Sequence, residues 1–249
     1  MITKVEFDKL HQKYETENFI NDDPVRFCHR FADKKDIEIA GFISSLLAYG
    51  RRDIFIKKLE ELFTIAQNEP YNFITSFEPK VLKDFNYRFG KTEDFIVIFN
   101  ILKNLYNKNS SLEELFQYGY ENNDNLFIPV SDYFYSNAKE ISQGFSFMIP
   151  NANKGSAMKR MCLYLRWMVR KSCVDMGIWD FMPKSDLLIP LDTHVARISR
   201  NLGLLERKQN DFKAVKELTE NLKQFCSDDP VKYDFALFGY GVQNPKISK

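Results

Sequence analysis

Apolar residues recur along most of this chain at the three- and four-residue spacing of an amphipathic helix. Residues 36–50 carry one such stripe, which consists of Ile39, Phe42, Ile43, Leu46 and Leu47, with Gly50 as the expected cap. Residues 52–66 carry a second stripe, which consists of Ile54, Leu59, Leu62, Phe63 and Ala66. Residues 92–106 are apolar on nearly all sides, which predicts a buried helix. Since no strand or hairpin pattern interrupts these segments, the sequence predicts an all-α fold of about ten helices.

Residues 188–205, which read LIPLDTHVARISRNLGLL, have the start and stop signals of a single helix. Pro190 disfavours helix at the residue before it, and Asp192 or Thr193 can accept hydrogen bonds from the first free N–H groups. Gly203 can end the helix in the left-handed conformation. On these local signals alone, Asp192 is interpreted as a helix cap.

The composition indicates a globular protein with no global charge signal. The 249 residues are 44% hydrophobic and carry a formal net charge of +1, so a nucleic-acid partner requires a local basic patch. The polar N-terminal residues do not read as a signal peptide, and no apolar run is long enough to span a bilayer. The four cysteines form no CxxC pair, so we expect no metal and no iron–sulfur cluster. A reduced, cytoplasmic protein without a membrane partner is the expectation.

One segment departs from this charge balance. Residues 154–171 contain six cations and no carboxylate, namely Lys154, Lys159, Arg160, Arg166, Arg170 and Lys171. Ser156 is the expected N-cap of a helix here, and the seven- and four-residue spacings place Lys159, Arg166 and Arg170 on one face. A row of cations suits a phosphate backbone, although a solvated polar face gives the same pattern.

The stretch PLDTHVARISRNLGLL (190–205) resembles the VDTHV signature of the helix-hairpin-helix DNA glycosylase superfamily, which includes endonuclease III and the 8-oxoguanine glycosylases. The resemblance maps the catalytic carboxylate of that motif onto Asp192. YDFALFGYGVQNP (233–245) is similar to the closing helix of the superfamily, and residues 41–62 are more loosely similar to its first helices. As a whole, the chain most resembles a bacterial family described only as a domain of unknown function.

The glycine-rich hairpin that usually carries the catalytic lysine of the superfamily is missing here. Instead, Lys159 precedes Asp192 by 33 positions (192 − 159), a spacing similar to that of the archaeal 8-oxoguanine glycosylase branch. The resemblance thus implies Lys159 as the nucleophile, with Lys154 as the second candidate. His194 is interpreted as a structural residue or a phosphate contact.

The resemblance implies a two-lobed all-α fold with a cleft between the lobes, and we expect residues 40–185 in one lobe and residues 1–39 with 186–249 in the other. It implies a glycosylase that excises a damaged base from duplex DNA, with or without AP-lyase activity. We expect no cofactor, and a monomer is the default where the sequence leaves the oligomeric state open. The expected nucleic-acid contacts are Lys154, Arg160, Arg166, Arg170, Lys171, His194 and Arg197. Candidates to receive a flipped-out base, although each is more typical of a core, are Tyr49, Phe145, Phe147, Trp167 and Trp179.

Two other functions fit the same residues. A non-catalytic nucleic-acid-binding module could keep the scaffold without the reaction, and the missing glycine hairpin favours it. The retention of both Asp192 and a lysine at the archaeal-like spacing opposes it. A helical interaction protein, in which Asp192 is only a cap, is the third interpretation.

Overall fold

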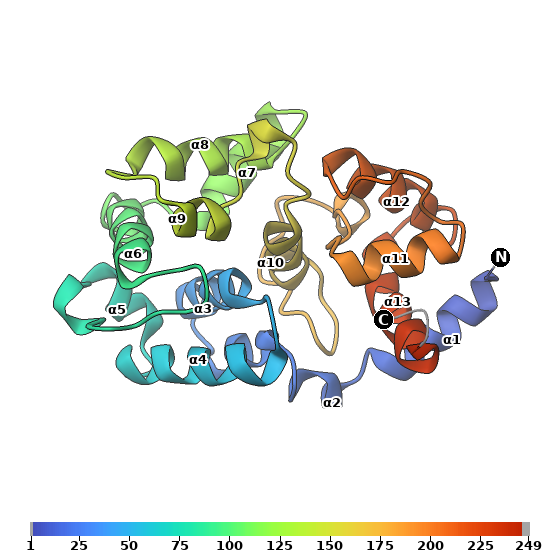
Figure 1. Ribbon diagram of the computed structural model, residues 1–249, viewed down its shortest axis with the longest axis horizontal. Coiled ribbons are helices and arrows are strands. Elements are labelled where there is room, and N and C mark those ends of the chain that lie inside the picture. Colours follow the sequence, from blue (N-terminus) through green and yellow to red (C-terminus); the bar gives the residue numbers. More distant parts are fainter. Residues whose placement is uncertain (1, 246–249) are drawn as a thin grey trace. The chain divides into compact units, whose positions relative to one another are not determined.

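The computed structural model describes residues 2–245, and every regular element in this range is helical (Figure 1). The α-helices are α1 (Lys4–Tyr14), α2 (Glu17–Ile20), α3 (Lys34–Leu47), α4 (Arg52–Ile65), α5 (Pro70–Thr75), α6 (Thr92–Asn107), α7 (Leu112–Asn122), α8 (Phe127–Asn137), α9 (Gln143–Met148), α10 (Lys159–Val169), α11 (Thr193–Asn201), α12 (Phe212–Lys223) and α13 (Tyr233–Gln243). The 3-10 helices are η1 (Pro24–Arg30), η2 (Pro79–Val81), η3 (Ala152–Lys154), η4 (Lys184–Asp186) and η5 (Pro230–Lys232). The predicted all-α class is confirmed.

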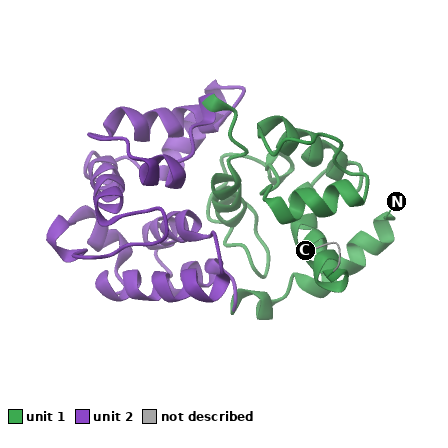
Figure 2. Cartoon of the chain, in the orientation of Figure 1, with its two compact units in different colours: residues 1–21, 154–249 green, residues 22–153 purple. Residues whose placement is uncertain are grey.

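The chain divides into two compact units (Figure 2). Unit 1 comprises residues 1–21 and 154–249, and unit 2 comprises residues 22–153. These bounds differ from those of the two expected lobes, 40–185 and 1–39 with 186–249. The second boundary moves because α10 is joined to unit 1 through its buried Arg170, whose guanidinium pairs with Glu15 and Asp229.

The predicted apolar stripes form much of the core of unit 2. All five residues of the α3 stripe are buried, and α6 buries an apolar face that includes Phe95, Ile98, Phe99 and Leu102. Two details differ from the prediction. Helix α3 ends at Leu47, with Ala48 rather than Gly50 as its cap, and α4 buries Phe55 while Ile54 is exposed.

Helices from both ends of the chain build unit 1. Helices α1 and α11 both pack against α13 (Figure 1). The rings of Phe7, Phe225 and Tyr233 meet with centroids 5.1 to 6.0 Å apart and join α1 to the C-terminal segment. This packing gives α10 and α11 the rigid support that a functional site requires.

Candidate active site

The start of α10 is fixed by a bent loop rather than by the predicted serine cap. Met158 precedes the helix in the left-handed conformation, with a φ of 51°, and Lys159 is the first helical residue. Ser156 does not cap α10; its backbone forms a bridge with Asp211, at the start of α12. The amide N–H of Phe212 also donates to the Gly155 carbonyl over 3.0 Å. These backbone contacts set the position from which the Lys159 side chain projects.

The start of α11 follows the sequence prediction closely. Asp192 is the N-cap, and its Oδ1 accepts a hydrogen bond of 2.8 Å from the Val195 N–H. At the other end, Gly203 has a φ of 73°, and the Leu204 N–H donates to the Ser199 carbonyl over 2.8 Å. This is a Schellman ending, which satisfies carbonyls that the helix leaves unpaired. A well-determined helix therefore holds the Asp192 carboxylate in place.

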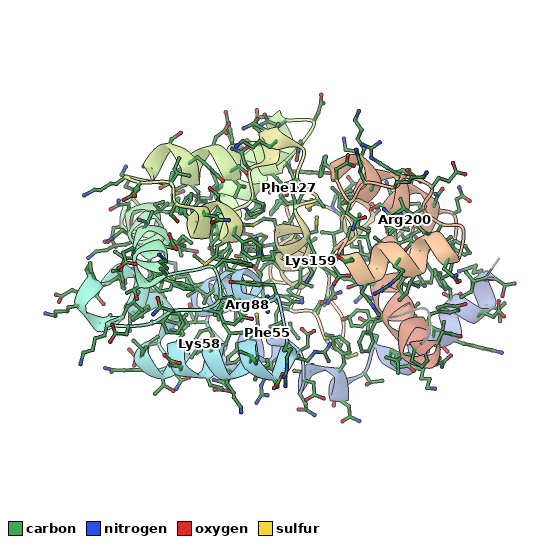
Figure 3. All side chains as sticks on the ribbon, viewed as in Figure 1. Phe55, Lys58, Arg88, Phe127, Lys159 and Arg200 are labelled. Atoms are coloured by element: carbon green, nitrogen blue, oxygen red, sulfur yellow. The ribbon has the colours of Figure 1, made fainter. Side chains whose placement is uncertain are left out.

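The two helix starts bring Lys159 and Asp192 together. The Lys159 Nζ lies 3.9 Å from the second carboxylate oxygen of Asp192, Oδ2. Their side chains are 30% and 41% exposed, so a substrate can reach both from solvent. The two oxygens of Asp192 thus serve different groups, because Oδ1 caps α11 and Oδ2 faces the lysine. Figure 3 labels Lys159 at the start of α10. The convergence of these two side chains, which the resemblance implied, is present in unit 1.

Arg166 and Arg170 do not form the nucleic-acid contacts that the sequence predicts. Their side chains are 2% and 4% exposed, although Arg166 lies on the helix that begins with Lys159 and Arg170 is its C-cap. Arg166 pairs with Asp175 and Asp234, and Arg170 pairs with Glu15, Asp175 and Asp229. Burial keeps both guanidinium groups away from a phosphate backbone. The prediction that Arg166 and Arg170 contact nucleic acid is therefore wrong, and both residues belong to a structural ion-pair network.

The network has marked electrostatic effects inside unit 1. Burial opposes ionisation of Glu15, but hydrogen bonds from His11 and Arg170 outweigh it and hold the pKa of Glu15 well below its usual range. Burial raises the pKa of Asp175, and the neighbouring Arg166 and Arg170 offset only part of that effect. Arg170 stays charged, since its hydrogen bond to Glu15 and the surrounding carboxylates outweigh its desolvation and raise its pKa.

The remaining predicted contacts stay accessible to different degrees. Lys154 and Lys171 are exposed, and Arg160, His194 and Arg197 are half-buried. Among the aromatic candidates for a base pocket, Phe145, Trp167 and Trp179 are buried and belong to the core. Tyr49 and Phe147 are partly exposed and lie in unit 2.

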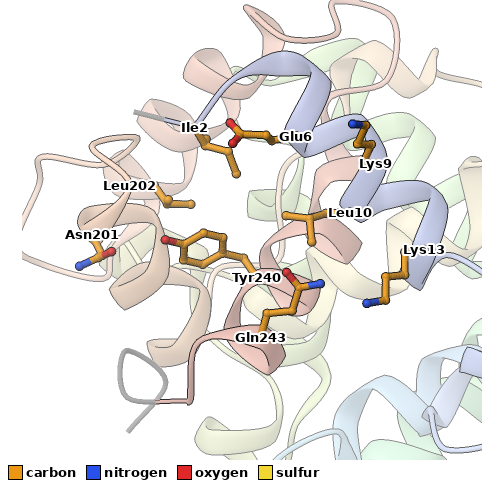
Figure 4. Close-up of a pocket in the computed structure, with 9 residues that line it drawn as sticks. All are labelled: Ile2, Glu6, Lys9, Leu10, Lys13, Asn201, Leu202, Tyr240 and Gln243. Atoms are coloured by element: carbon orange, nitrogen blue, oxygen red, sulfur yellow. The ribbon is translucent and has the colours of Figure 1, made fainter.

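A pocket that no sequence pattern predicts opens elsewhere in unit 1, among α1, α11 and α13 (Figure 4). Its volume is about 530 Å³, and its lining consists of Ile2, Glu6, Lys9, Leu10, Lys13, Asn201, Leu202, Tyr240 and Gln243. Neither Lys159 nor Asp192 is part of this lining. Local patterns could not predict the pocket, because it forms only when the two ends of the chain pack together.

Metal-ligand clusters and membrane-spanning helices are both absent from the described residues. Among residues 2–245, no group of three or more His, Cys, Asp or Glu side chains is arranged to hold a metal ion. Within the same range, no helix combines the length and the apolar character needed to cross a membrane.

The fold and the paired side chains define an all-helical protein of two units, with a lysine and an aspartate joined at two helix starts in unit 1. The chain belongs to a family described as a protein of unknown function (DUF2400), whose model matches residues 23–243. The searches found no match among curated proteins or among solved structures. The family assignment therefore carries no activity with it.

Proposed function

We propose that this protein is a DNA glycosylase that excises a damaged base, with Asp192 and Lys159 as its catalytic residues. The observation that carries the proposal is the distance of 3.9 Å between Lys159 Nζ and Asp192 Oδ2. The resemblance of residues 190–205 to the glycosylase signature implies the catalytic role of Asp192, and the archaeal-like spacing of 33 positions before it (192 − 159) implies that of Lys159. A carboxylate and an amine within reach of one sugar carbon are the minimum that the reaction needs.

Asp192 would stabilise the charge that develops on the sugar. Cleavage of an N-glycosidic bond places positive charge on C1′ and the ring oxygen, and a fixed carboxylate lowers the energy of that state. The hydrogen bond from Val195 to Oδ1 holds the group without occupying Oδ2. Capping and catalysis are therefore compatible at this residue, since each uses its own oxygen.

Lys159 would act as the nucleophile in its neutral form. The amine forms a bond to C1′ while the bond between C1′ and the base breaks, and the base leaves with the electron pair and takes up a proton. The C1′–O4′ bond then breaks. The nitrogen loses a proton, O4′ takes up a proton to become a hydroxyl, and the C1′–N bond becomes the double bond of a Schiff base. The side-chain exposure of Lys159 leaves it accessible to such a substrate.

The cations near the start of α10 support a phosphate-bearing substrate. Lys159 and Arg160 occupy the first turn of the helix, which has no acidic residue and no side-chain cap. A helix N-terminus carries partial positive charge and attracts anions, and two cations in its first turn add to that attraction. Lys154 and Lys171 add exposed positive charge in the same unit.

A non-catalytic nucleic-acid-binding module is the second candidate. The hydrogen bond from the Val195 N–H to Asp192 Oδ1 favours it, because a cap alone explains why an aspartate stands at this position. The missing glycine-rich hairpin favours it as well. Such a module would bind DNA through the same cations and would leave the glycosidic bond intact.

The experiment that separates the two candidates is base release from a panel of duplexes, each with one damaged base. We expect the wild-type protein to release at least one of these bases. Asp192→Asn keeps an oxygen for the cap but loses the charge, so release should fall by roughly 10²- to 10³-fold. Thr193→Ala, a change of the exposed neighbouring residue, is the matched control and should act like wild type. Equal rates for Asp192→Asn and wild type would contradict the proposal.

A further inference from the structure

A cluster of aromatic rings around one arginine lies on the surface of unit 2. The Tyr49 ring makes a tilted contact with Tyr87 and an edge contact with Phe147, with ring centroids 4.8 and 4.7 Å away, and the Phe89 ring lies 4.7 Å from that of Phe147. Phe89 is 50% exposed and Phe147 is 36% exposed. The Arg88 guanidinium lies over both Tyr49 and Phe89, at 5.7 and 5.8 Å from their centroids. We call Tyr49, Arg88, Phe89 and Phe147 the aromatic platform.

The platform is held rigidly by the backbone beneath it. The Tyr49 hydroxyl donates to the Tyr87 carbonyl over 3.0 Å, and the Tyr87 hydroxyl donates to the Tyr49 carbonyl in return. Tyr87 and Gly90 exchange two backbone hydrogen bonds of 2.9 Å, which makes Arg88 and Phe89 the central residues of a tight turn. Exposed rings in a fixed position lose little entropy when a flat ligand stacks on them.

The turn holds Arg88 in a conformation that its side chain disfavours. Arg88 has a φ of 52° at the first central position, where glycine is the preferred residue. Its guanidinium packs directly on Gly50, because a Cβ there would meet Arg88 Nη1 at 2.5 Å. A conformation of this cost persists where the surrounding structure enforces it, and such positions gather at functional sites. Here the turn places the Arg88 guanidinium over the rings of Tyr49 and Phe89.

We propose that the aromatic platform binds the unpaired bases of single-stranded nucleic acid. Exposed rings stack on the π-face of any base, and the arginine adds cation–π attraction and charge complementary to the phosphates. Within residues 2–245, no carboxylate forms an ion pair with Arg88, so its charge is available to a phosphate. A second copy of the chain fits less well, because a twofold contact through this patch would bring two Arg88 cations together.

This binding site rests on nucleic acid being the partner in the proposed function, but it requires no reaction at Lys159 or Asp192. The two proposals can therefore fail separately. Loss of single-strand binding would leave base release from duplexes to be tested, and an inert Asp192 would leave the aromatic platform in place.

The test is fluorescence anisotropy of the full chain with a labelled oligothymidine and with an abasic strand of the same length. We expect the base-containing strand to bind more tightly than the abasic strand. Phe89→Ala and Phe147→Ala should each weaken binding by roughly 5- to 100-fold, the effect of losing one stacked base. Phe89→Trp keeps an aromatic ring at this position and should bind the strand as tightly as wild type. Tyr118→Ala, which removes an exposed ring on α7 outside the platform, should bind like wild type.

Arg88→Gly separates binding from folding. Glycine suits this turn, so the melting temperature should stay level or rise, while strand binding weakens. Equal affinity for the base-containing and abasic strands, or wild-type affinity in both phenylalanine variants, would overturn the proposal. A loss of self-association in those variants, with strand binding unchanged, would assign the surface to a second copy instead.

Discussion

The two ends of helix α10 carry the same kinds of side chain and use them in opposite ways. At its start, Lys159 is 30% exposed and faces the Oδ2 atom of Asp192 at 3.9 Å. Toward its end, Arg166 and Arg170 are almost fully buried, and several carboxylates surround them. Charge in a sequence therefore does not by itself indicate a binding surface. Burial decides whether a cation can contact a ligand or instead stabilises the fold through ion pairs.

The largest loss of stability is expected when the buried ion pairs of Arg170 are removed. Arg170→Ala leaves Glu15, Asp175 and Asp229 without their shared partner, and one uncompensated buried charge costs about 3–5 kcal/mol. Urea unfolding should show this loss, or the variant should fail to fold. Lys171→Ala, which removes the adjacent exposed cation, should change the free energy of unfolding by about 0.5 kcal/mol or less. Equal stability of the two variants would contradict the structural role of Arg170.

Acid should weaken the same network. The pKa of Glu15 is lower in the folded than in the unfolded chain, so its contribution is complete above the unfolded pKa and is lost as the pH falls below it. Glu15→Gln should therefore be less stable than wild type at about pH 6, and the difference should shrink toward about pH 3. Urea midpoints across this range measure it. A difference that stays constant with pH would show that Glu15 acts through packing and not through its charge.

At the open end, the cap of α11 should contribute modestly to stability. Asp192→Ala removes the acceptor for the Val195 N–H and should cost about 1 kcal/mol, whereas Asp192→Asn should cost less because its amide oxygen can accept the same bond. Thermal unfolding of the two variants makes the comparison. A larger loss for Asn than for Ala would mean that Oδ1 is not the stabilising group.

The smallest effect concerns the exposed cations of unit 1. Duplex DNA binding should weaken as salt rises, and Lys154→Ala or Lys171→Ala should each reduce the slope of log K against log salt by about 1. Lys108→Ala changes an exposed lysine at the end of α6 in unit 2 and provides a charge-matched control. Should all three variants keep the wild-type slope, neither Lys154 nor Lys171 contacts a phosphate.

Much of the fold could be predicted from the sequence because its signals are local. The stripe in α3, the apolar α6 and the cap and glycine of α11 all act over a few residues, and the structure follows them. The burial of Arg166 and Arg170 could not be predicted. Their partners Asp234, Asp229 and Glu15 lie 68, 59 and 155 positions away along the chain, and only the packed unit brings them together. The unit boundary at residue 154 depends on the same distant contacts.

The central claim, that Lys159 and Asp192 form a glycosylase site, is tested most directly by borohydride trapping. A Schiff base between Lys159 and the sugar is reduced to a stable covalent link, which a gel shift and peptide mapping can locate. Incubated with duplexes that carry damaged bases, the wild-type protein should give an adduct on Lys159. Lys159→Gln should give none while it still binds DNA, and Lys154→Gln should trap like wild type. An adduct that persists in Lys159→Gln, or no adduct with any damaged duplex, would contradict the assignment of Lys159 as the nucleophile.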